Sequence, residues 1–301
     1  MGPLDIAVRF SLYLDLAVLF GVPFFALLAP GIRGALPSGR IVLATAIAGL
    51  VLSTFGLVAL TASMAGVPLA GIDLATVVMI LAMPVGIAWI VRIASLAAIV
   101  LAVMALHGRP AALLAVASSG GAIVLSTLAW NGHGAMDAAM TGWVHLGADI
   151  AHLITAGAWV GANVGLLILV LRPPGVLDAP ALGATHRALD GFGTTGTIIV
   201  AVILVTGLIN GWLLVGPTNI FALLTTLYGQ LLLAKLALFA AMLAAAAANR
   251  YLLTPALADR IETGDHSAAL LGLRVSLALE TGCALLVLAL VAWLGTLEPI
   301  A

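Results

Sequence analysis

The chain has 301 residues, of which 63% are hydrophobic and 8% charged, and its formal net charge is −1. Soluble domains carry about 25% charged residues, so this composition excludes a soluble globular protein and indicates an integral membrane protein. The near-neutral charge gives no sign of a nucleic-acid partner or an acidic substrate. The single cysteine, Cys283, excludes a disulfide framework and a cysteine metal cluster.

Apolar windows of about 20 residues, long enough to cross about 30 Å of hydrocarbon, predict an all-α polytopic membrane protein with about eight spans. The first window lacks a basic n-region and is interpreted as a span, not as a cleaved signal peptide. Residues 72–106 are apolar for too long for one crossing, and Pro84 offers a break, so we expect a short helix or re-entrant piece at 72–83. The predicted spans are 4–28, 41–65, 84–106, 111–130, 143–171, 190–215, 228–250 and 272–297.

Basic residues in the connections predict the orientation. The connections after the second, fourth and sixth spans contain no Lys or Arg. By the positive-inside rule the basic connections face the cytoplasm, so both termini are predicted to be periplasmic in a multi-pass protein of the bacterial inner membrane. The connections after the first, third, fifth and seventh spans hold Arg33, Arg40, Arg109, Arg172, Arg187, Arg250 and Arg260.

An internal similarity suggests two halves within the single membrane domain 1–301. The stretches "LAMPVGIAWIVRIASLAAIVL" and "LTTLYGQLLLAKLALFAAMLA" each have a glycine followed six residues later by a cation, Gly86 with Arg92 and Gly229 with Lys235. An offset of four spans keeps both copies in one orientation, which predicts parallel repeats, 1–130 and 143–301. Chance likeness between Ala/Leu-rich helices is the alternative.

The fifth span carries a polar stripe. His145, Asp149 and His152 stand at i, i+4 and i+7, so they share one helix face, which Trp159 and Asn163 continue. Such a face must meet protein or water inside a membrane, and ionisable groups there are costly. Imidazole and carboxylate suit Cu(II), Zn(II) or Ni(II). We therefore interpret the stripe as functional, with hydrogen-bonded packing residues as the structural alternative.

The connection before this span offers further candidate ligands. It contains His133, Met136 and Met140, the two methionines one helical turn apart. Thioether sulfur selects Cu(I), although methionine is also an ordinary gap-filler in cores. The oxidation state of a bound ion is therefore left open by the sequence.

Isolated polar residues in other spans need partners. Asp15, Arg92, Lys235 and Glu280 lie inside the first, third, seventh and eighth spans, and Asn210 lies in the sixth. Acid–base pairs of this kind either lock helices together or take part in proton or cation movement. We treat all five as candidates for pathway or helix-pairing residues.

The stretches "HLGADIAHLITAGAWVGANVGLL", "TGLINGWLLVG" and "LYGQLLLAKLALFAAMLAAAAANR" resemble the copper resistance protein D (CopD) family. The resemblance implies a bacterial inner-membrane protein that moves copper from periplasm to cytoplasm, often alongside a periplasmic copper-binding protein of the CopC type. Related sequences commonly have a histidine where this chain offers Asp15, which leaves a mixed carboxylate–imidazole site open. The family residues that carry over are His145, His152, Trp159, Gly161, Asn210, Lys235, Asn249 and Arg250.

The residues and the resemblance together predict a copper importer, not an enzyme, in which the outer connection collects the ion and the His145–Asp149–His152 stripe passes it inward. The sequence has no G-x-x-x-x-G-K-[ST] segment, so no ATP-binding loop is expected. Two alternatives remain open at this point: a membrane factor that binds and delivers copper without transporting it, and a b-type haem protein. Haem would require axial histidines from different helices, and His107 and His186 are the others within reach of the inner face.

Overall fold

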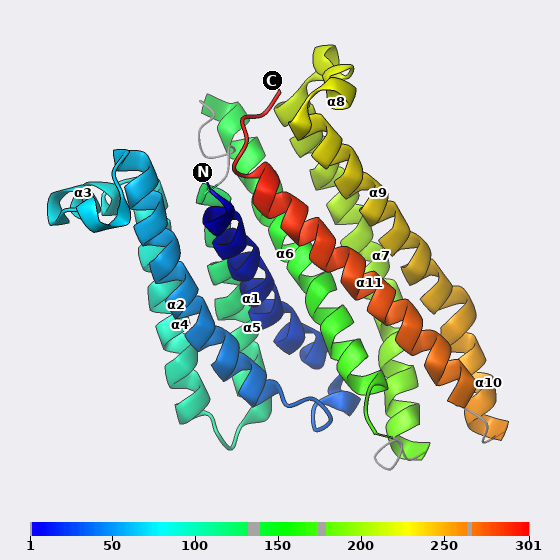
Figure 1. The fold of residues 1–301 in the computed structure, drawn as a ribbon. Helices are drawn as coiled ribbons and strands as arrows, with labels where there is room; N and C mark the ends of the chain where they lie inside the picture. The colour runs from blue at the N-terminus through cyan, green and yellow to red at the C-terminus, as the bar shows by residue number, and fades with distance from the viewer. Residues whose placement is uncertain (1, 132–138, 174–178, 264–266, 301) are drawn as a thin grey trace.

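The computed structural model describes residues 2–131, 139–173, 179–263 and 267–300, and all regular structure in these ranges is helical (Figure 1). Eight helices of the described ranges are long and apolar enough to cross a membrane, which confirms the all-α polytopic fold. The long helices are α1 (Pro3–Leu28), α2 (Ser38–Ala65), α4 (Pro84–Ala105), α5 (Pro110–Ser126), α6 (Ala139–Val170), α7 (Ala179–Val215), α9 (Leu227–Ala248) and α11 (Ser267–Leu294). The short ones are α3 (Leu74–Leu81), α8 (Ala222–Thr225) and α10 (Thr254–Thr263).

Short turns connect several of these helices. The 3₁₀ turns are η1 (Pro30–Ile32), η2 (Leu69–Gly71), η3 (Thr127–Asn131) and η6 (Pro217–Asn219), and η7 (Asn249–Leu253) is a π turn. The π turn joins α9 to α10 directly before Pro255, whose ring would clash with the carbonyl of Tyr251 in a regular α-helix. A wider turn relieves this clash, so the chain continues as a helix to Thr263.

Two helices extend beyond the windows that hydropathy predicts. α7 begins at Ala179, eleven residues before the expected start at 190, and α9 runs through η7 into α10. The added segment of α7, "APALGATHRAL", is mixed in polarity and contains no proline after its first turn. Hydropathy detects the stretch that can lie in hydrocarbon, whereas the helix continues for as long as its backbone allows. The break at Pro84 is as expected, with α3 before it and α4 beginning at the proline.

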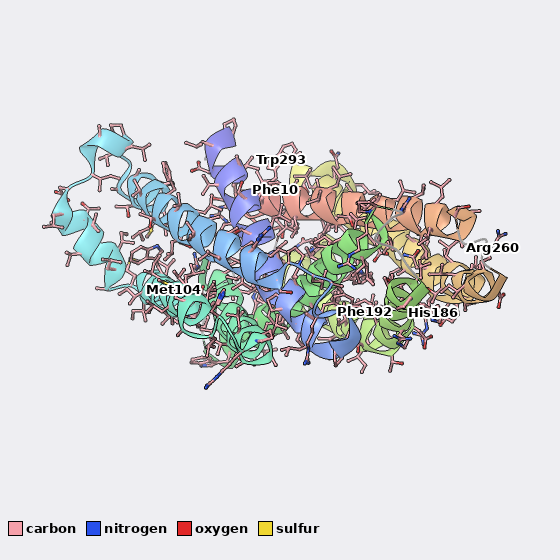
Figure 2. All side chains as sticks on the ribbon, turned by 90° about the horizontal axis from the view of Figure 1, so that it is seen from below. Phe10, Met104, His186, Phe192, Arg260 and Trp293 are labelled. Carbon is pink, nitrogen blue, oxygen red and sulfur yellow. The ribbon has the colours of Figure 1, made fainter. Side chains whose placement is uncertain are left out.

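Both termini lie at one end of the bundle, the upper end in Figure 1, near α3 and α8. α10 and the connections between α1 and α2 and between α4 and α5 lie at the opposite, lower end. Figure 2 views the molecule from this lower end, where His186 of α7 and Arg260 of α10 lie in the half built from the later helices. The connections rich in arginine therefore share the lower end, and the termini share the upper end.

α1 and α6 cross at the centre through a glycine face. Gly157, Gly161 and Gly165 repeat every four residues on α6, the small-residue spacing that lets membrane helices approach closely. A Cβ placed on Gly161 would lie 2.1 Å from the carbonyl carbon of Gly21 on α1, and one on Gly21 would lie 2.1 Å from the Gly157 oxygen. These backbones are thus in direct contact, and α1 and α6 join the two halves of the molecule.

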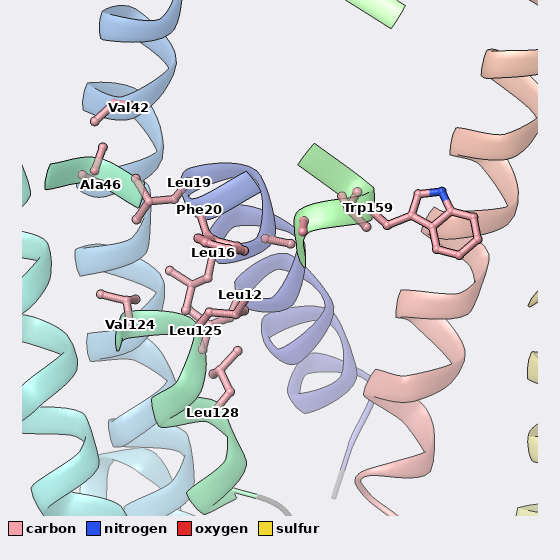
Figure 3. Packing of buried hydrophobic residues seen from close by; sticks show 14 of the residues in the cluster. Leu12, Leu16, Leu19, Phe20, Val42, Ala46, Val124, Leu125, Leu128 and Trp159 are labelled. Carbon is pink, nitrogen blue, oxygen red and sulfur yellow. The ribbon is translucent and has the colours of Figure 1, made fainter. Parts of the chain in front are cut away.

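The main apolar core surrounds α1 (Figure 3). Leu12, Leu16 and Phe20 of α1 are buried, with Val124 and Leu125 of α5 in the same cluster. Trp159 of α6 projects away from this group toward α11 (Figure 3). α6 therefore has two distinct sides, a glycine side on α1 and a polar side turned to the later helices.

The two predicted repeats share one local feature at the start of their third spans. Gly86 admits the backbone of the preceding segment, because its Cβ would lie 2.2 Å from Ile80 O, and Gly229 does the same with the Cα of Leu223 at 2.3 Å. A short helix, α3 or α8, precedes each glycine. The halves differ elsewhere: α2 packs closely on α4, whereas α7 and α9 have little backbone contact over the described residues.

Arginines at the lower end bond the last carbonyls of the helices. Arg33 Nε donates to Ala26 O at 3.1 Å and its Nη2 to Leu27 O at 3.2 Å, both in α1. Arg274 Nε donates to Val170 O, at the end of α6, at 2.7 Å. Cations in these positions satisfy orphan carbonyls and complement the negative end of the helix dipole.

Candidate functional site

The upper part of the polar stripe joins α6 to α7. His145 is buried, and its Nε2 lies 3.9 Å from Asp149 Oδ2, one helical turn further on. Asn210 of α7 donates from Nδ2 to Asp149 Oδ1 at 2.6 Å, a short bond of the charge-assisted kind. The Oδ1 of the same Asn210 is buried without a hydrogen-bond partner. An imidazole, a carboxylate and an unused amide oxygen therefore lie together between two helices.

His152 forms a second level on the same face. Its Nδ1 lies 2.9 Å from Thr206 Oγ1 on α7, and the Thr206 hydroxyl donates to Val202 O at 2.7 Å. Because the hydroxyl proton is used on Val202, the oxygen is left to accept from Nδ1–H of the histidine. Nε2 of His152 then carries the free lone pair, and fixing the tautomer from the other ring nitrogen is the usual arrangement for a metal-binding histidine.

Three side chains from other helices lie within electrostatic range of Asp149. Lys235 of α9 is half-buried and close enough to Asp149 and His152 for their charges to interact. The phenols of Tyr13 on α1 and Tyr228 on α9 also lie within electrostatic range of Asp149. Side chains of α1, α7 and α9 therefore all interact with the carboxylate of Asp149 on α6.

The lower part of the stripe ends on a buried carboxylate of α11. Trp159 Nε1 donates to Glu280 Oε1 at 2.6 Å and Asn163 Nδ2 to the same oxygen at 2.9 Å. Asn249, the first residue of η7, donates from Nδ2 to Glu280 Oε2 at 3.0 Å. The side chain of Trp159 also packs edge-on against Phe239 of α9, with ring centroids 5.9 Å apart. Every residue of the predicted stripe thus contacts protein.

Two of the expected charged residues, Arg92 and Asp15, have their described contacts with the earlier helices. Arg92 is buried and bonds Thr127 at the end of α5, from Nε to Oγ1 at 2.7 Å and from Nη2 to the carbonyl at 3.2 Å. Asp15 faces α2, where a Cβ on Gly49 would lie 3.0 Å from its Oδ2. One oxygen of Asp15 therefore lies on the α2 side of α1, and a mixed carboxylate–imidazole site that includes Asp15 stays a prediction.

Two of the remaining predicted ligands, His133 and Met136, lie outside the described residues. The third, Met140, falls in the first turn of α6. Of the histidines considered for haem, His107 is exposed in the turn between α4 and α5, and His186 is half-buried near the start of α7. His145 and His152 both lie on α6, so they do not form a pair of axial haem ligands from two different helices.

Within the described part of the chain, no three His, Cys, Asp or Glu side chains converge on one point. Instead, polar groups follow α6 from the upper end downward: His145 with Asp149, then His152, then Trp159 and Asn163 on Glu280. Such a series of incomplete sites can pass a cation on more easily than a closed cage, because release from each site is less costly.

Several partners of the site were not predicted from the sequence. Thr206 stands one turn before Asn210, so the i, i+4 spacing within "TGLINGW" was a usable signal. Thr127, Tyr13 and Tyr228 have no comparable pattern, because no spacing within their own segments relates them to residues of α4 or α6. Their role becomes visible only when the helices are assembled.

The fold and the site together define a polytopic membrane protein with eight candidate spans in its described ranges and a His–Asp–His face on the fifth of them turned to the sixth. Comparison with known proteins gives the family: the chain belongs to the copper resistance protein D family. The model for copper resistance protein D matches residues 186–294, and the model for the N-terminal domain of copper resistance protein D-like proteins matches residues 2–143.

Individual relatives agree with this assignment. Copper resistance protein D of Pseudomonas syringae pv. tomato is 40% identical over 306 residues, covering 99% of this chain and 97% of the relative. Inner membrane protein YebZ of Escherichia coli (strain K12) is 33% identical, covering 57% of this chain and 55% of the relative. Copper transport protein CutJ of Bacillus subtilis (strain 168) is 34% identical, covering 44% of this chain and 23% of the relative. No solved structure matches the chain significantly.

Proposed function

We propose that this protein imports copper across the bacterial inner membrane, from periplasm to cytoplasm. Relatives named for copper resistance and copper transport support the choice of copper, and a relative named as an inner membrane protein supports the location. The observation that carries the proposal is the succession of polar groups on α6, which leads from its upper end into the protein. The positive-inside rule makes that upper end periplasmic.

The ion enters in this proposal at the upper end, where His133, Met136 and Met140 precede or begin α6. A periplasmic copper-binding protein of the CopC type is the proposed donor. The ion then passes to His145 and Asp149, with the unused oxygen of Asn210 beside them. The Nε2 of His152 is the next ligand inward, about 10 Å from His145 by helical rise. Imidazole ligands accept copper in both oxidation states, which suits a route that begins with thioether sulfur.

Copper accumulation in cells tests this proposal. His145→Ala and His152→Ala are expected to abolish the accumulation that the wild-type protein confers, because each removes an intramembrane ligand. His107→Ala is the matched control, since His107 is an exposed histidine outside the stripe. Membrane content of each variant is measured in parallel, and normal accumulation by either stripe variant at normal content would contradict the proposal.

Reconstituted protein separates transport from binding and delivery alone. Copper uptake into proteoliposomes is expected to load the lumen, whereas a protein that only binds copper would hold the metal at the outer surface and leave the lumen empty. An absorption spectrum of the same preparation tests the haem alternative. A Soret band that His145→Ala or His152→Ala abolished would assign these residues to haem and overturn the copper route.

A further inference from the structure

Glu280 is a carboxylate in the interior of the bundle whose hydrogen-bond partners are all neutral. Its side chain is 3% exposed and accepts hydrogen bonds from Trp159, Asn163 and Asn249. A buried carboxylate without a counter-ion is costly in its ionised form, and three hydrogen bonds offset only part of that cost. Protonation of Glu280 would therefore remove a buried charge and its cost.

In the described part of the chain, no charged group on the neighbouring helices forms an ion pair with Glu280. Several are engaged elsewhere: Arg274 with Val170 O, Arg250 with Gly193 O at 2.6 Å, and Lys235 with Asp149. Among the residues that the structure describes, Glu280 is bonded by these three neutral donors and forms no ion pair. The titratable groups described on α11 and on the elements packed against it are Asp5, Arg9, Tyr13, Asp15, His145, Asp149, His152, Tyr228, Lys235, Arg250, Tyr251, Asp259, Arg260, Arg274 and Cys283.

The two oxygens of Glu280 are not equivalent. Oε1 accepts two hydrogen bonds, at 2.6 and 2.9 Å, from side chains of α6. Oε2 accepts one, at 3.0 Å, from the Asn249 amide. Oε2 is therefore the oxygen with room for a proton, because Oε1 already faces two N–H groups.

Asn249 supplies what a protonated Oε2 needs. It is 7% exposed, and its Oδ1 is buried without a hydrogen-bond partner. A half-turn of the amide about its Cβ–Cγ bond exchanges Nδ2 and Oδ1, so the same side chain can donate to an ionised carboxylate or accept from a protonated one. Asn249 also begins the π turn η7, a distortion often found at functional sites.

We propose that Glu280 is a proton-binding site: Oε2 takes a proton from water, Asn249 turns its amide so that Oδ1 accepts the new O–H, and release reverses both changes. The second part of the inference is that this proton moves in exchange with copper. This part rests on the proposed copper transport. α6 links the two sites, because it carries His145, Asp149 and His152 above and Trp159 and Asn163 on Glu280 below.

Infrared difference spectroscopy of the reconstituted full-length protein tests the proton site directly. Lowering the pH is expected to produce a carboxylic C=O band that is absent in Glu280→Gln and present in Glu298→Gln, whose carboxylate is exposed near the C-terminus. Asn249→Leu is expected to keep the band and move it to higher frequency, because the protonated carboxyl loses its acceptor. Should Glu280→Gln not assemble in the membrane, this frequency shift alone makes the assignment. Identical bands in all these proteins would overturn the proposal.

Proton movement during copper uptake tests the coupling. In proteoliposomes with a pH-sensitive dye inside, copper addition is expected to change the lumenal pH for wild type and Glu298→Gln, and the signal is lost in Glu280→Gln. Copper uptake by the wild type without any pH change would overturn the coupling and leave the proposed transport intact. Absence of copper uptake in the wild type would overturn the transport proposal and the coupling with it, while the infrared band still decides the proton site.

Discussion

The amide of Asn210 donates a 2.6 Å hydrogen bond to the carboxylate of Asp149 and so ties α7 to the polar face of α6. Asn210→Leu keeps a side chain branched at Cγ and removes this donor from a partly buried anion. We expect the initial rate of copper uptake to fall several-fold and the free energy of unfolding to fall by about 2 kcal/mol, typical of a hydrogen bond to a charged group. Uptake assays and thermal unfolding in detergent measure the two effects. Thr194→Val, an exposed position of the same helix, serves as control, and equal uptake by both variants would refute the role of Asn210.

The hydroxyl of Thr206 is expected to orient His152 for binding. Thr206→Val preserves the shape and removes the acceptor for Nδ1–H, so the histidine loses its fixed tautomer. Partners of this kind commonly contribute 10–100-fold to metal affinity, and we expect at least about a tenfold loss in copper titrations of purified protein. Thr155→Val is the control, because the Thr155 hydroxyl bonds only carbonyls of its own helix. A similar affinity in the two variants would show that Thr206 does not position the ring.

Because the backbones of Gly21 and Gly161 are in contact, we expect one added methyl group at Gly161 to lower the stability of the protein. Gly161→Ala would place a Cβ 2.1 Å from the backbone of α1, so the two helices must separate, at a cost of about 3 kcal/mol or more. Gly147→Ala on the same helix meets nothing within 4 Å and is expected to be neutral or slightly stabilising. Thermal unfolding of the two variants in detergent compares them, and equal midpoints would contradict the close crossing.

The shared role of Gly86 and Gly229 offers a test of the proposed repeats. Alanine at either position would collide with the backbone of the preceding segment, so we expect α3 or α8 to be displaced. Protease digestion of membrane vesicles is expected to show faster cleavage within 66–83 for Gly86→Ala and within 216–226 for Gly229→Ala. Gly282→Ala, with open space around it, is the control. A response in only one half would argue against a common origin of the two segments.

The positive-inside rule predicts that the upper end of the bundle is periplasmic. An alkaline phosphatase fused after Ala301 is therefore expected to be active, and one fused after Arg109, in the turn between α4 and α5, to be inactive. A green fluorescent protein at the same two positions is expected to give the opposite pattern. Reversed signals at both sites would invert the proposed direction of copper entry.

Much of the fold was predictable, because a helix that crosses the hydrocarbon of a membrane must be long enough and apolar. The break at Pro84 and the ends of α1, α2 and α4 follow from apolar windows and a helix breaker. The start of α7 at Ala179 did not follow, since a helix that leaves the membrane no longer needs apolar residues. The polar face of α6 was predictable from spacing alone, because His145, Asp149 and His152 lie on one helix.

The partners of that face could not be predicted in the same way. Glu280 and Asn249 are 31 residues apart on different helices, and no local pattern indicates that they meet. Asp15 is similar: its depth in the first span was predictable, but the rotation of α1 that places it beside Gly49 of α2 was not. Helix rotation depends on packing with all neighbours at once, whereas span length depends on one segment of sequence.

The glycine contact between α1 and α6 also limits how the molecule can move. Where two backbones touch, neither helix can tilt inward or turn about its axis without a collision. We therefore expect α1 and α6 to move together as one rigid unit within the bilayer. α7 and α9, by contrast, have little backbone contact and hold Asn210, Thr206 and Lys235 around the histidines of α6. A gate for an ion on the proposed route is therefore expected to open where α7 and α9 face each other, and distance measurements between spin labels on these two helices would follow it.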